Sequence, residues 1–282
     1  MDMSSRTPDA GAGTIERALR LVRLLATGGT RGVALTDAAR RTGLPHGTVH
    51  RLLRRLIAER LVRQIEGTRR YALGPLAFEL GLAASTQFDI RSHCRPTLGR
   101  LAEHVDDTVY LTTRSGLEAV CADRFEGRAP IRVLELEVGS RRPLGLGAGG
   151  LAILAAFDPE ESDELIERLM RGPEFAPGGR ATLVAAVLET RSRGYALVHD
   201  RVTRGVTAVG VPVRNSLRVP VAAISVAAIH ERMSTAKVRQ LATLLRIATA
   251  EIERSLRREA APEHDEEVSP ARGARRRARA VE

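Results

Sequence analysis

Aromatic side chains are scarce in this sequence. They make up 3% of its 282 residues, and tryptophan is absent. Within residues 14–76 the only aromatic residue is Tyr71. Proteins that read single-stranded RNA stack the bases on aromatic rings, so this shortage argues against an RNA-binding surface of that kind in this part of the chain.

Cysteines and long apolar runs are also few. Cys94 and Cys121 are the only two cysteines, too few for a disulfide framework or a cysteine-rich zinc site, and we expect two reduced, buried thiols. No apolar run approaches the roughly 20 residues that span a bilayer, and residues 1–13 lack the apolar stretch of a signal peptide. These absences predict a cytoplasmic protein with no membrane partner.

Lysine is nearly missing as well, since Lys237 is the only one among 44 basic residues, and the formal net charge is +10. The charge is concentrated in one segment. Residues 14–76 hold 13 arginines against four acidic residues, a net charge of +9, and the rest of the chain carries +1. A general preference for arginine does not explain this clustering. A compact basic segment is what binding to a phosphate backbone requires.

The length allows about two domains, and 43% hydrophobic residues are enough for buried cores. Residues 1–13 are small and polar and are predicted to be disordered. The pattern then predicts an N-terminal domain over residues 14–75, a linker helix over residues 76–88 and a second domain over residues 89–258. Residues 259–282 lack apolar periodicity and are predicted to form a disordered tail.

The N-terminal domain begins with a helical pattern. Thr14 can cap this helix, and its apolar stripe is Ile15, Ala18, Leu19, Val22 and Leu25. A second, short helix is expected from an N-cap near Thr36 to a stop at Gly43, and a third over residues 46–59. The third helix has one apolar face and carries basic and polar side chains on its other faces.

Residues 35–54 thus predict two helices joined by a short turn that contains glycine, a helix-turn-helix. The DNA major groove admits one helix, whose side chains reach the base edges. Strand-like runs at residues 61–65 and 69–73 predict a hairpin, the wing. For any single arginine, a solvated helix face is the alternative. The candidate DNA contacts are the polar and basic residues of these elements: Thr36, His46, Thr48, His50, Arg51, Arg54, Arg55, Arg69 and Arg70.

The rest of the chain mixes helical and strand periods, which predicts an α+β domain. Helices are expected over residues 90–105, 151–157, 160–170 and 182–193, and from an N-cap at Ser234 to about residue 258. Strands are expected over residues 108–114, 118–125, 131–138, 195–199, 206–213 and 219–229.

Several runs of this sequence resemble, in order, landmarks of the IclR family of bacterial transcription regulators. In the N-terminal part they are ERALRL (16–21), LTDAARRTGLP (35–45), TVHRLL (48–53) and YALG (71–74). In the second part they are VCADR (120–124), VGSRRPL (138–144), RGYA (193–196), GVTAVGVPV (205–213) and AAISV (222–226). The resemblance covers about residues 14–258.

The resemblance implies an N-terminal winged helix-turn-helix and a C-terminal GAF-like α+β effector-binding domain. It also implies a sequence-specific DNA-binding regulator, most often a repressor of a metabolic or catabolic operon, that is released by a small organic effector such as a carboxylate or an aromatic metabolite. Such regulators bind double-stranded operators as homodimers or as dimers of dimers.

In the family, the effector lies between a glycine-rich loop and the strands that face it. Carried over by position, the effector contacts are Leu146, Ala148, Gly149, Val198, Ala208, Ser225 and Ala227. Loop amides at a helix N-terminus suit a carboxylate, and the Ser225 hydroxyl adds a polar group.

The loop departs from the common Thr-Ala-x-Gly-Lys pattern, because residues 147–151 contain neither threonine nor lysine. At Val198, Ala208 and Ala227 some members carry a polar or thiol side chain. This depleted pocket predicts a larger, more apolar effector, or none. Without an effector, the protein would be an architectural or effector-independent DNA-binding protein with a degenerate sensor domain.

The sequence offers no catalytic or metal-binding set. His199, Asp200 and His230 lack the spacing of a zinc site, and Ser225 has no G-x-S-x-G setting. We therefore expect no enzyme activity, no metal and no cofactor. The competing hypothesis, an enzyme tethered to nucleic acid by its basic domain, needs a convergent acid, base or nucleophile set that the sequence does not offer.

Overall fold

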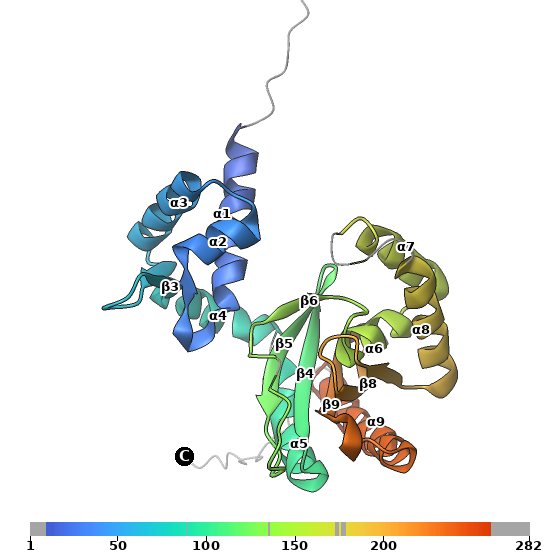
Figure 1. Cartoon of the computed structure of the whole chain (residues 1–282). Coiled ribbons are helices and arrows are strands. Elements are labelled where there is room, and N and C mark those ends of the chain that lie inside the picture. The colour runs from blue at the N-terminus through green and yellow to red at the C-terminus, as the bar shows by residue number, and fades with distance from the viewer. Residues whose placement is uncertain (1–9, 89, 135, 173–174, 176–178, 261–282) are drawn as a thin grey trace, which may run out of the picture.

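The computed structural model describes residues 10–88, 90–134, 136–172, 175 and 179–260. Figure 1 shows a small, mostly helical N-terminal part and a larger part built on a β-sheet, joined by helix α4. The fold is α+β, as predicted.

The N-terminal part contains three helices and a small sheet. The helices are α1 (Ala10–Ala26), α2 (Leu35–Thr42) and α3 (His46–Ala58). The antiparallel sheet has the order β1 (Val33–Ala34), β3 (Arg70–Leu73) and β2 (Val62–Gln64). A single apolar cluster holds these elements together, and its fully buried side chains include Leu21, Leu25, Val49 and Leu53.

Three details of this part differ from the sequence predictions. Helix α1 begins at Ala10, so residues 10–13 are helical rather than disordered and Thr14 lies inside the helix instead of capping it; residues 1–9 of the predicted disordered stretch lie outside the described residues. Helix α2 begins at Leu35 after Ala34, so Thr36 is not the N-cap. Gly43, with φ of +67°, ends α2 as predicted.

The apolar stripe predicted for α1 is only partly buried. Leu25 is buried, but the side chains of Ile15 and Leu19 are 65% and 48% exposed. The core takes Leu21 and Leu24 instead. The apolar surface of α1 is therefore wider than the domain core covers, and part of it remains at the surface.

Helix α4 (Pro75–Phe88) connects the two parts. Proline at the first helical position is favourable, because its missing N–H would have no partner there. Phe78, Leu80 and Leu82 are all more than half exposed. An ion pair between Arg60 and Glu79, with Nη2 and Oε1 3.1 Å apart, fixes the helix to the end of α3.

The C-terminal part contains a six-stranded antiparallel sheet. Its order is β6 (Arg141–Pro143), β5 (Glu118–Phe125), β4 (Thr108–Ser115), β9 (Pro220–Ile229), β8 (Val206–Arg214) and β7 (Ala196–His199). Helices α5 (Ile90–Val105) and α9 (Thr235–Ala260) pack on one face. Helices α6 (Ala148–Ala156), α7 (Pro159–Leu169) and α8 (Gly179–Arg193) lie over the other.

Strand alternation separates the two faces. On β9, Ile224 and Val226 pack into the cluster beneath α5 and α9, whereas Ala223 joins the cluster around α6. At the start of α9, the backbone N–H of Lys237 donates to Ser234 Oγ at 3.2 Å, which confirms the predicted cap. Helix α9 continues to Ala260, two residues into the stretch predicted as a disordered tail; residues 261–282 lie outside the described residues.

The predicted strand at residues 131–138 is wrong. The described residues 131–134 and 136–138 form no strand, and the edge of the sheet is β6, which pairs with β5. The backbone of this stretch bonds to side chains of the neighbouring strands instead of a strand ladder, for example through the Tyr110 hydroxyl, which donates to the Val133 carbonyl.

Small residues bring α6 close to the sheet. The helix starts at Ala148, earlier than predicted, so Gly149 and Gly150 lie in its first turn. A Cβ on Gly149 would lie 2.6 Å from Thr112 Oγ1, and one on Gly210 would lie 2.6 Å from the Ala148 carbonyl oxygen. The glycines therefore allow a close approach that larger residues would prevent.

Asp123 fastens α5 to strand β5. Its side chain is 6% exposed, and its carboxylate accepts hydrogen bonds from Arg91 Nε and Arg95 Nη1, each at 2.9 Å. The pairing of β4 with β5 shifts between Leu111 and Thr112, so that Leu111 faces Asp123 and Thr112 faces Cys121. This bulge turns Asp123 toward α5 and leaves its neighbours Cys121 and Arg124 on the opposite face.

We expect Asp123→Asn to lower the free energy of unfolding by about 1.5–3 kcal/mol, the range for hydrogen bonds to charged groups. The lower part of that range is expected because both arginines are about half exposed and water can solvate them. Urea unfolding of the full chain measures the change. Asp163→Asn, at an exposed position on α7, is the matched control, and an equal effect of both variants would contradict this role.

Candidate DNA interface and ligand cavity

Helix α3 presents its basic side chains to solvent. Its inner face is fixed by the buried Val49, Leu52 and Leu53. On the remaining faces, His46, His50 and three arginines are exposed, and Thr48 is half-buried. The arginines are Arg51, Arg54 and Arg55, and none of them has an ion pair with another described residue. They are therefore available to an external anion.

Helix α2 contributes less. Thr36 is exposed at its start, but Arg40 is paired with Asp37, with Nη2 and Oδ1 2.7 Å apart. Arg41 Nη2 donates to Thr27 Oγ1 at 3.3 Å. These two arginines are tied within the domain, which leaves α3 as the main basic surface of the helix-turn-helix.

The wing carries three arginines in different settings. Arg69 and Arg63 are exposed and make no ion pair within the described chain, whereas Arg70 Nη1 donates to the Gly32 carbonyl at 2.9 Å and so fixes the loop before β1. Sequence reasoning missed Arg63. The available signal was its place beside Val62, because the side chains of adjacent strand residues point to opposite faces and Val62 is buried.

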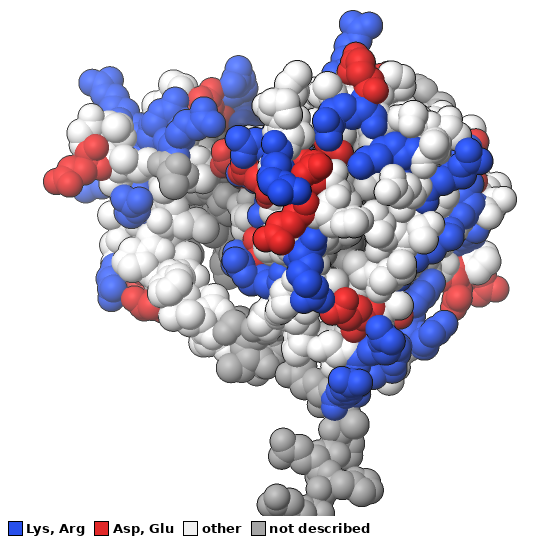
Figure 2. Space-filling view, turned by 90° about the horizontal axis from the view of Figure 1, so that it is seen from below, with Lys and Arg blue, Asp and Glu red and all other residues white. Residues whose placement is uncertain are grey.

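Elsewhere the basic side chains are interspersed with acidic ones. On the face shown in Figure 2, blue and red groups lie side by side. Many of the arginines in the C-terminal part form ion pairs, such as Arg128 with Asp106 and Arg180 with Glu167. The net positive charge of the N-terminal part thus coincides with arginines that lack such partners.

A cavity lies between the sheet, the N-terminus of α6 and residues 133 and 136. Its volume is about 680 Å³, counting its open mouth. Six of the seven predicted effector contacts line it: Ala148, Gly149, Val198, Ala208, Ser225 and Ala227. Leu146, in the turn before α6, is not among its lining residues.

Sequence reasoning missed the charged residues of this cavity. Arg142 and Arg201 line it, and no acidic side chain is found among its described lining residues. Arg201 Nη1 donates to the Gly145 carbonyl at 3.3 Å. Both arginines reach the cavity from segments that the sequence does not connect, strand β6 and the β7–β8 loop, so local patterns gave no signal. The cavity therefore has mostly apolar walls, and its charged lining residues, Arg142 and Arg201, are both positive.

Two further features favour an anion there. The first N–H groups of a helix have no partner inside it, and those of α6 lie where Ala148 and Gly149 line the cavity. The hydroxyls of Thr112, Thr203 and Ser225 also line it. The arrangement can hold an apolar molecule that carries a carboxylate.

The two cysteines are buried, as expected. Burial raises the pKa of Cys121, which lines the cavity, to about 11. Burial and the nearby Asp123 carboxylate raise the pKa of Cys94 to about 12. The thiolate is the reactive form, so both side chains are unreactive near neutral pH.

The histidine pair noted in the sequence meets at Thr207. The ring nitrogens Nδ1 of His199 and His230 lie 2.9 and 3.1 Å from Thr207 Oγ1. The part of the chain that the structure describes contains no group of three or more metal-ligating side chains. Among the same residues, no helix has the length and apolar character needed to cross a membrane.

A basic helix-turn-helix with a wing, joined to an α+β domain with a cavity that apolar residues and two arginines line, defines a transcription regulator with two domains. Comparison with known families agrees. The model described as "IclR helix-turn-helix domain" matches residues 14–66, and "Bacterial transcriptional regulator IclR C-terminal" matches residues 82–254. The chain belongs to the IclR family of DNA-binding transcription regulators.

Among curated proteins, the glycerol operon regulatory protein of Streptomyces griseus is 32% identical over 250 residues, covering 86% of this chain and 96% of that protein. The transcriptional repressor IclR of Escherichia coli is 27% identical over 247 residues, covering 85% and 88%. The relatives named here are regulators of operons or transcription rather than enzymes.

Solved structures give the same result. An IclR transcriptional regulator from Silicibacter superposes with a TM-score of 0.71 at 26% identity, covering 87% of this chain and 96% of that one. An IclR homolog from Microbacterium hydrocarbonoxydans, solved in complex with 4-hydroxybenzoate, has a TM-score of 0.65 at 23% identity, with coverage of 87% and 99%. The match to the Microbacterium structure shows that the two chains share a fold.

The raised pKa values predict slow alkylation of both cysteines. With a pKa of about 11 instead of 9, Cys121 has about 100-fold less thiolate at pH 8, and Cys94 has still less. Iodoacetamide should therefore modify both residues at least about 100-fold more slowly in the native than in the urea-denatured chain, as measured by peptide mass spectrometry. Rapid alkylation of the native protein would contradict the burial described here.

Proposed function

We propose that this protein is an operon repressor that leaves its operator when an organic anion with an apolar body fills the cavity of the C-terminal domain. The observation that carries this proposal is the cavity itself, which has apolar walls and charged lining residues that are both arginines.

The cavity chemistry suggests an aromatic or branched carboxylate. Val133, Leu136, Val198 and Val206 offer apolar surface for a ring or a hydrocarbon chain. A guanidinium binds a carboxylate through two parallel hydrogen bonds, and the N-terminus of α6 adds backbone donors. The related Microbacterium structure holds 4-hydroxybenzoate, a molecule of this class. These points favour a ligand-responsive regulator over one with a degenerate sensor domain.

On DNA, we propose that α3 enters the major groove and that the wing contacts the adjacent backbone. Arg51 and Arg54 would reach base edges, preferably guanines. His46 and Thr48, at the start of a helix whose N-cap, Pro45, has no capping side chain, would meet a base or a phosphate. Thr36, His50, Arg55, Arg63, Arg69 and Arg70 complete the proposed contact surface.

We propose further that the regulator is a homodimer, or a dimer of such dimers, that pairs two helix-turn-helix units on a palindromic operator. The exposed apolar side chains of α1 and α4 support this. Ile15, Leu19, Phe78, Leu80 and Leu82 are all about half exposed or more, and apolar side chains gathered at a surface mark contact sites. A second copy would bury them.

The proposal assigns no enzymatic role and no cofactor to the chain, in line with the regulators to which it is similar. Because its target is chromosomal DNA, it places the protein in the cytoplasm. An architectural DNA-binding protein is the competing function. Footprinting separates the two, since a regulator protects a short defined site and an architectural protein covers DNA of any sequence.

We expect Arg51→Ala to weaken binding to the selected operator by about 1–3 kcal/mol and to relax the preference at one base pair. Arg69→Ala should weaken binding to all sequences alike and lower the salt slope by about one. Fluorescence anisotropy with operator and scrambled duplexes at several salt concentrations measures both. Arg180→Ala, at an exposed arginine of α8, is the matched control. Wild-type binding by both wing and helix variants would contradict the proposed interface.

We expect calorimetry to detect binding of 4-hydroxybenzoate or benzoate, and Arg201→Ala to weaken it about 10- to 100-fold, the effect of losing a hydrogen bond to a charged group. Binding of the neutral analogue benzamide should change little. Arg204→Ala, an exposed neighbour outside the cavity lining, is the control. Tight binding of glyoxylate or pyruvate instead would contradict the apolar-body proposal, and no binding of any acid would favour the effector-independent alternative.

A further inference from the structure

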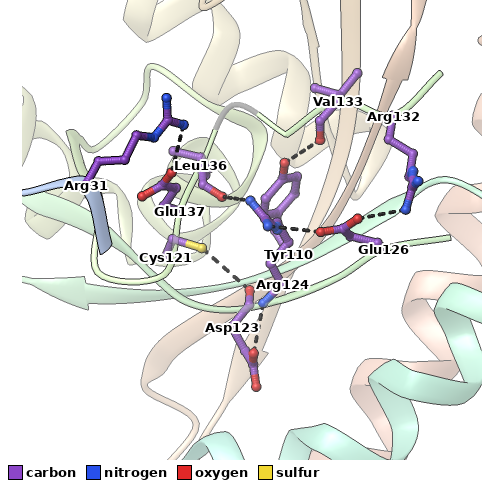
Figure 3. A network of polar contacts seen from close by, with 10 residues as sticks. All are labelled: Arg31, Tyr110, Cys121, Asp123, Arg124, Glu126, Arg132, Val133, Leu136 and Glu137. Carbon is purple, nitrogen blue, oxygen red and sulfur yellow. Dashed lines mark hydrogen bonds and ion pairs between the residues drawn. The ribbon is translucent and has the colours of Figure 1, made fainter. Parts of the chain in front are cut away.

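One stretch of the C-terminal domain touches both the ligand cavity and the DNA-binding domain. It consists of residues 131–134 and 136–140, which we call the connecting segment. Val133 and Leu136 line the cavity. Glu137, next in the chain, lies beside Arg31 of the N-terminal domain, as Figure 3 shows.

The cavity end of the segment is held by a few side chains rather than by strand pairing. The Tyr110 hydroxyl donates to the Val133 carbonyl at 2.5 Å, and Arg124 Nη1 donates to the Leu136 carbonyl at 3.2 Å. Val133 also packs with Tyr110, Cys121 and Ala227 in a small buried cluster. Tyr110, Cys121 and Ala227 are themselves cavity walls, so the segment packs against residues that a ligand in the cavity would contact.

Arg124 is the residue that positions the segment. The bulge in β5 places it on the cavity side of the sheet, next to the segment. Its Nη2 lies 3.0 Å from Glu126 Oε1, and Glu126 Oε2 accepts a hydrogen bond from Arg132 Nη1 at 2.8 Å. The Arg124 guanidinium therefore contacts the segment directly at Leu136 and, through the Glu126 carboxylate, also at Arg132.

The other end of the segment rests on the turn between α1 and β1. Glu137 Oε1 lies 3.8 Å from Arg31 Nη2. The Glu137 carboxylate also occupies the space beside Gly29, where any Cβ would collide with it. At Gly139 a Cβ would lie 3.3 Å from the Ala26 carbonyl oxygen. This turn leads through the short strand β1 into α2, the first helix of the helix-turn-helix.

We propose that the connecting segment transmits occupancy of the cavity to the helix-turn-helix of the same chain, through Val133 and Leu136 at one end and Glu137 at the other. A ligand that packs against Val133 and Leu136 displaces the segment, and Glu137 then loses its contacts with Arg31 and Gly29. The inference rests on the proposed ligand-responsive function and names how that site acts. The contact is well suited to this, because an exposed pair at 3.8 Å is weak and the binding energy of a ligand is enough to break it.

Hydrogen exchange of the full-length chain, followed by mass spectrometry, tests the route without operator or ligand. Ala227→Leu fills the cavity beside Val133. It should raise exchange about two- to fivefold in peptides from residues 131–140 and also from residues 27–33, the range expected for loss of an exposed ion pair. Glu137→Gln alone should raise exchange in residues 27–33 by the same factor. In the double variant the two effects on residues 27–33 should not add.

One control variant is available. Glu167→Gln removes an exposed ion pair on α7 and should leave residues 27–33 unchanged. If Ala227→Leu fails to fold, Tyr110→Phe releases the Val133 carbonyl and should have the same two effects as Ala227→Leu.

The proposal is overturned if cavity variants alter residues 131–140 but not residues 27–33, or if they alter residues 27–33 equally when Glu137 is Gln. It is likewise overturned if a control variant alters residues 27–33. A failure of the ligand-responsive function would appear in calorimetry and would leave these exchange results unchanged, so the two outcomes are distinguishable.

Discussion

The carboxylate of Asp123 organises the centre of this molecule. It is buried on strand β5 and receives two arginines from α5, the helix that follows the linker. A buried carboxylate is stable only when donors surround it, so α5 must lie where Arg91 and Arg95 can reach it. The same bulge that turns Asp123 toward α5 places Cys121 and Arg124 on the cavity side. One irregularity in one strand thus sets the docking of α5, a wall of the cavity and the support of the connecting segment.

The arginines of the two domains have different partners. In the C-terminal domain, many guanidinium groups pair with carboxylates or bond to carbonyl oxygens, as Arg191 does with Ala155 and Phe157 at the end of α6. On α3, Arg51, Arg54 and Arg55 have no ion pair within the described chain. Unpaired like charges repel one another and slightly destabilise a free domain, and phosphates would relieve that repulsion. The charge that makes the surface suitable for DNA therefore also slightly lowers the stability of the protein when no DNA is bound.

Local patterns predicted most of the elements. The bounds of α3 and of the strands β5 and β8 follow from periodicity and turn residues, and the structure agrees within a residue or two. The failures have non-local causes. Residues 131–138 alternate like a strand, but a strand also needs a partner, and here side chains of β4 and β5 bind the backbone instead. Periodicity likewise showed that α1 has an apolar face without showing how much of it the core covers.

The two candidate sites also differ in how far local sequence patterns predict them. The exposed residues of α3 could be assigned from one helix alone, because the buried positions of a helix fix which residues point outward. The cavity required strands and loops that are far apart in sequence. The family resemblance located six of its walls, but Arg142 and Arg201 come from β6 and the β7–β8 loop, and only the folded chain brings them together. Their charge adds two cationic groups to the less polar site that the sequence predicts.

The near absence of lysine has a practical consequence for chemistry on this protein. Guanidinium groups keep their positive charge across the pH range of folded proteins, so the basic surface of α3 and the wing does not weaken in alkaline buffers. Reagents that acylate amines leave that surface untouched and find one lysine, Lys237 at the start of α9, whose ammonium group lies 3.5 Å from the Val105 carbonyl oxygen. The chain thus offers a single lysine for attaching a dye or a surface tether, on the opposite domain from the arginines that would touch DNA.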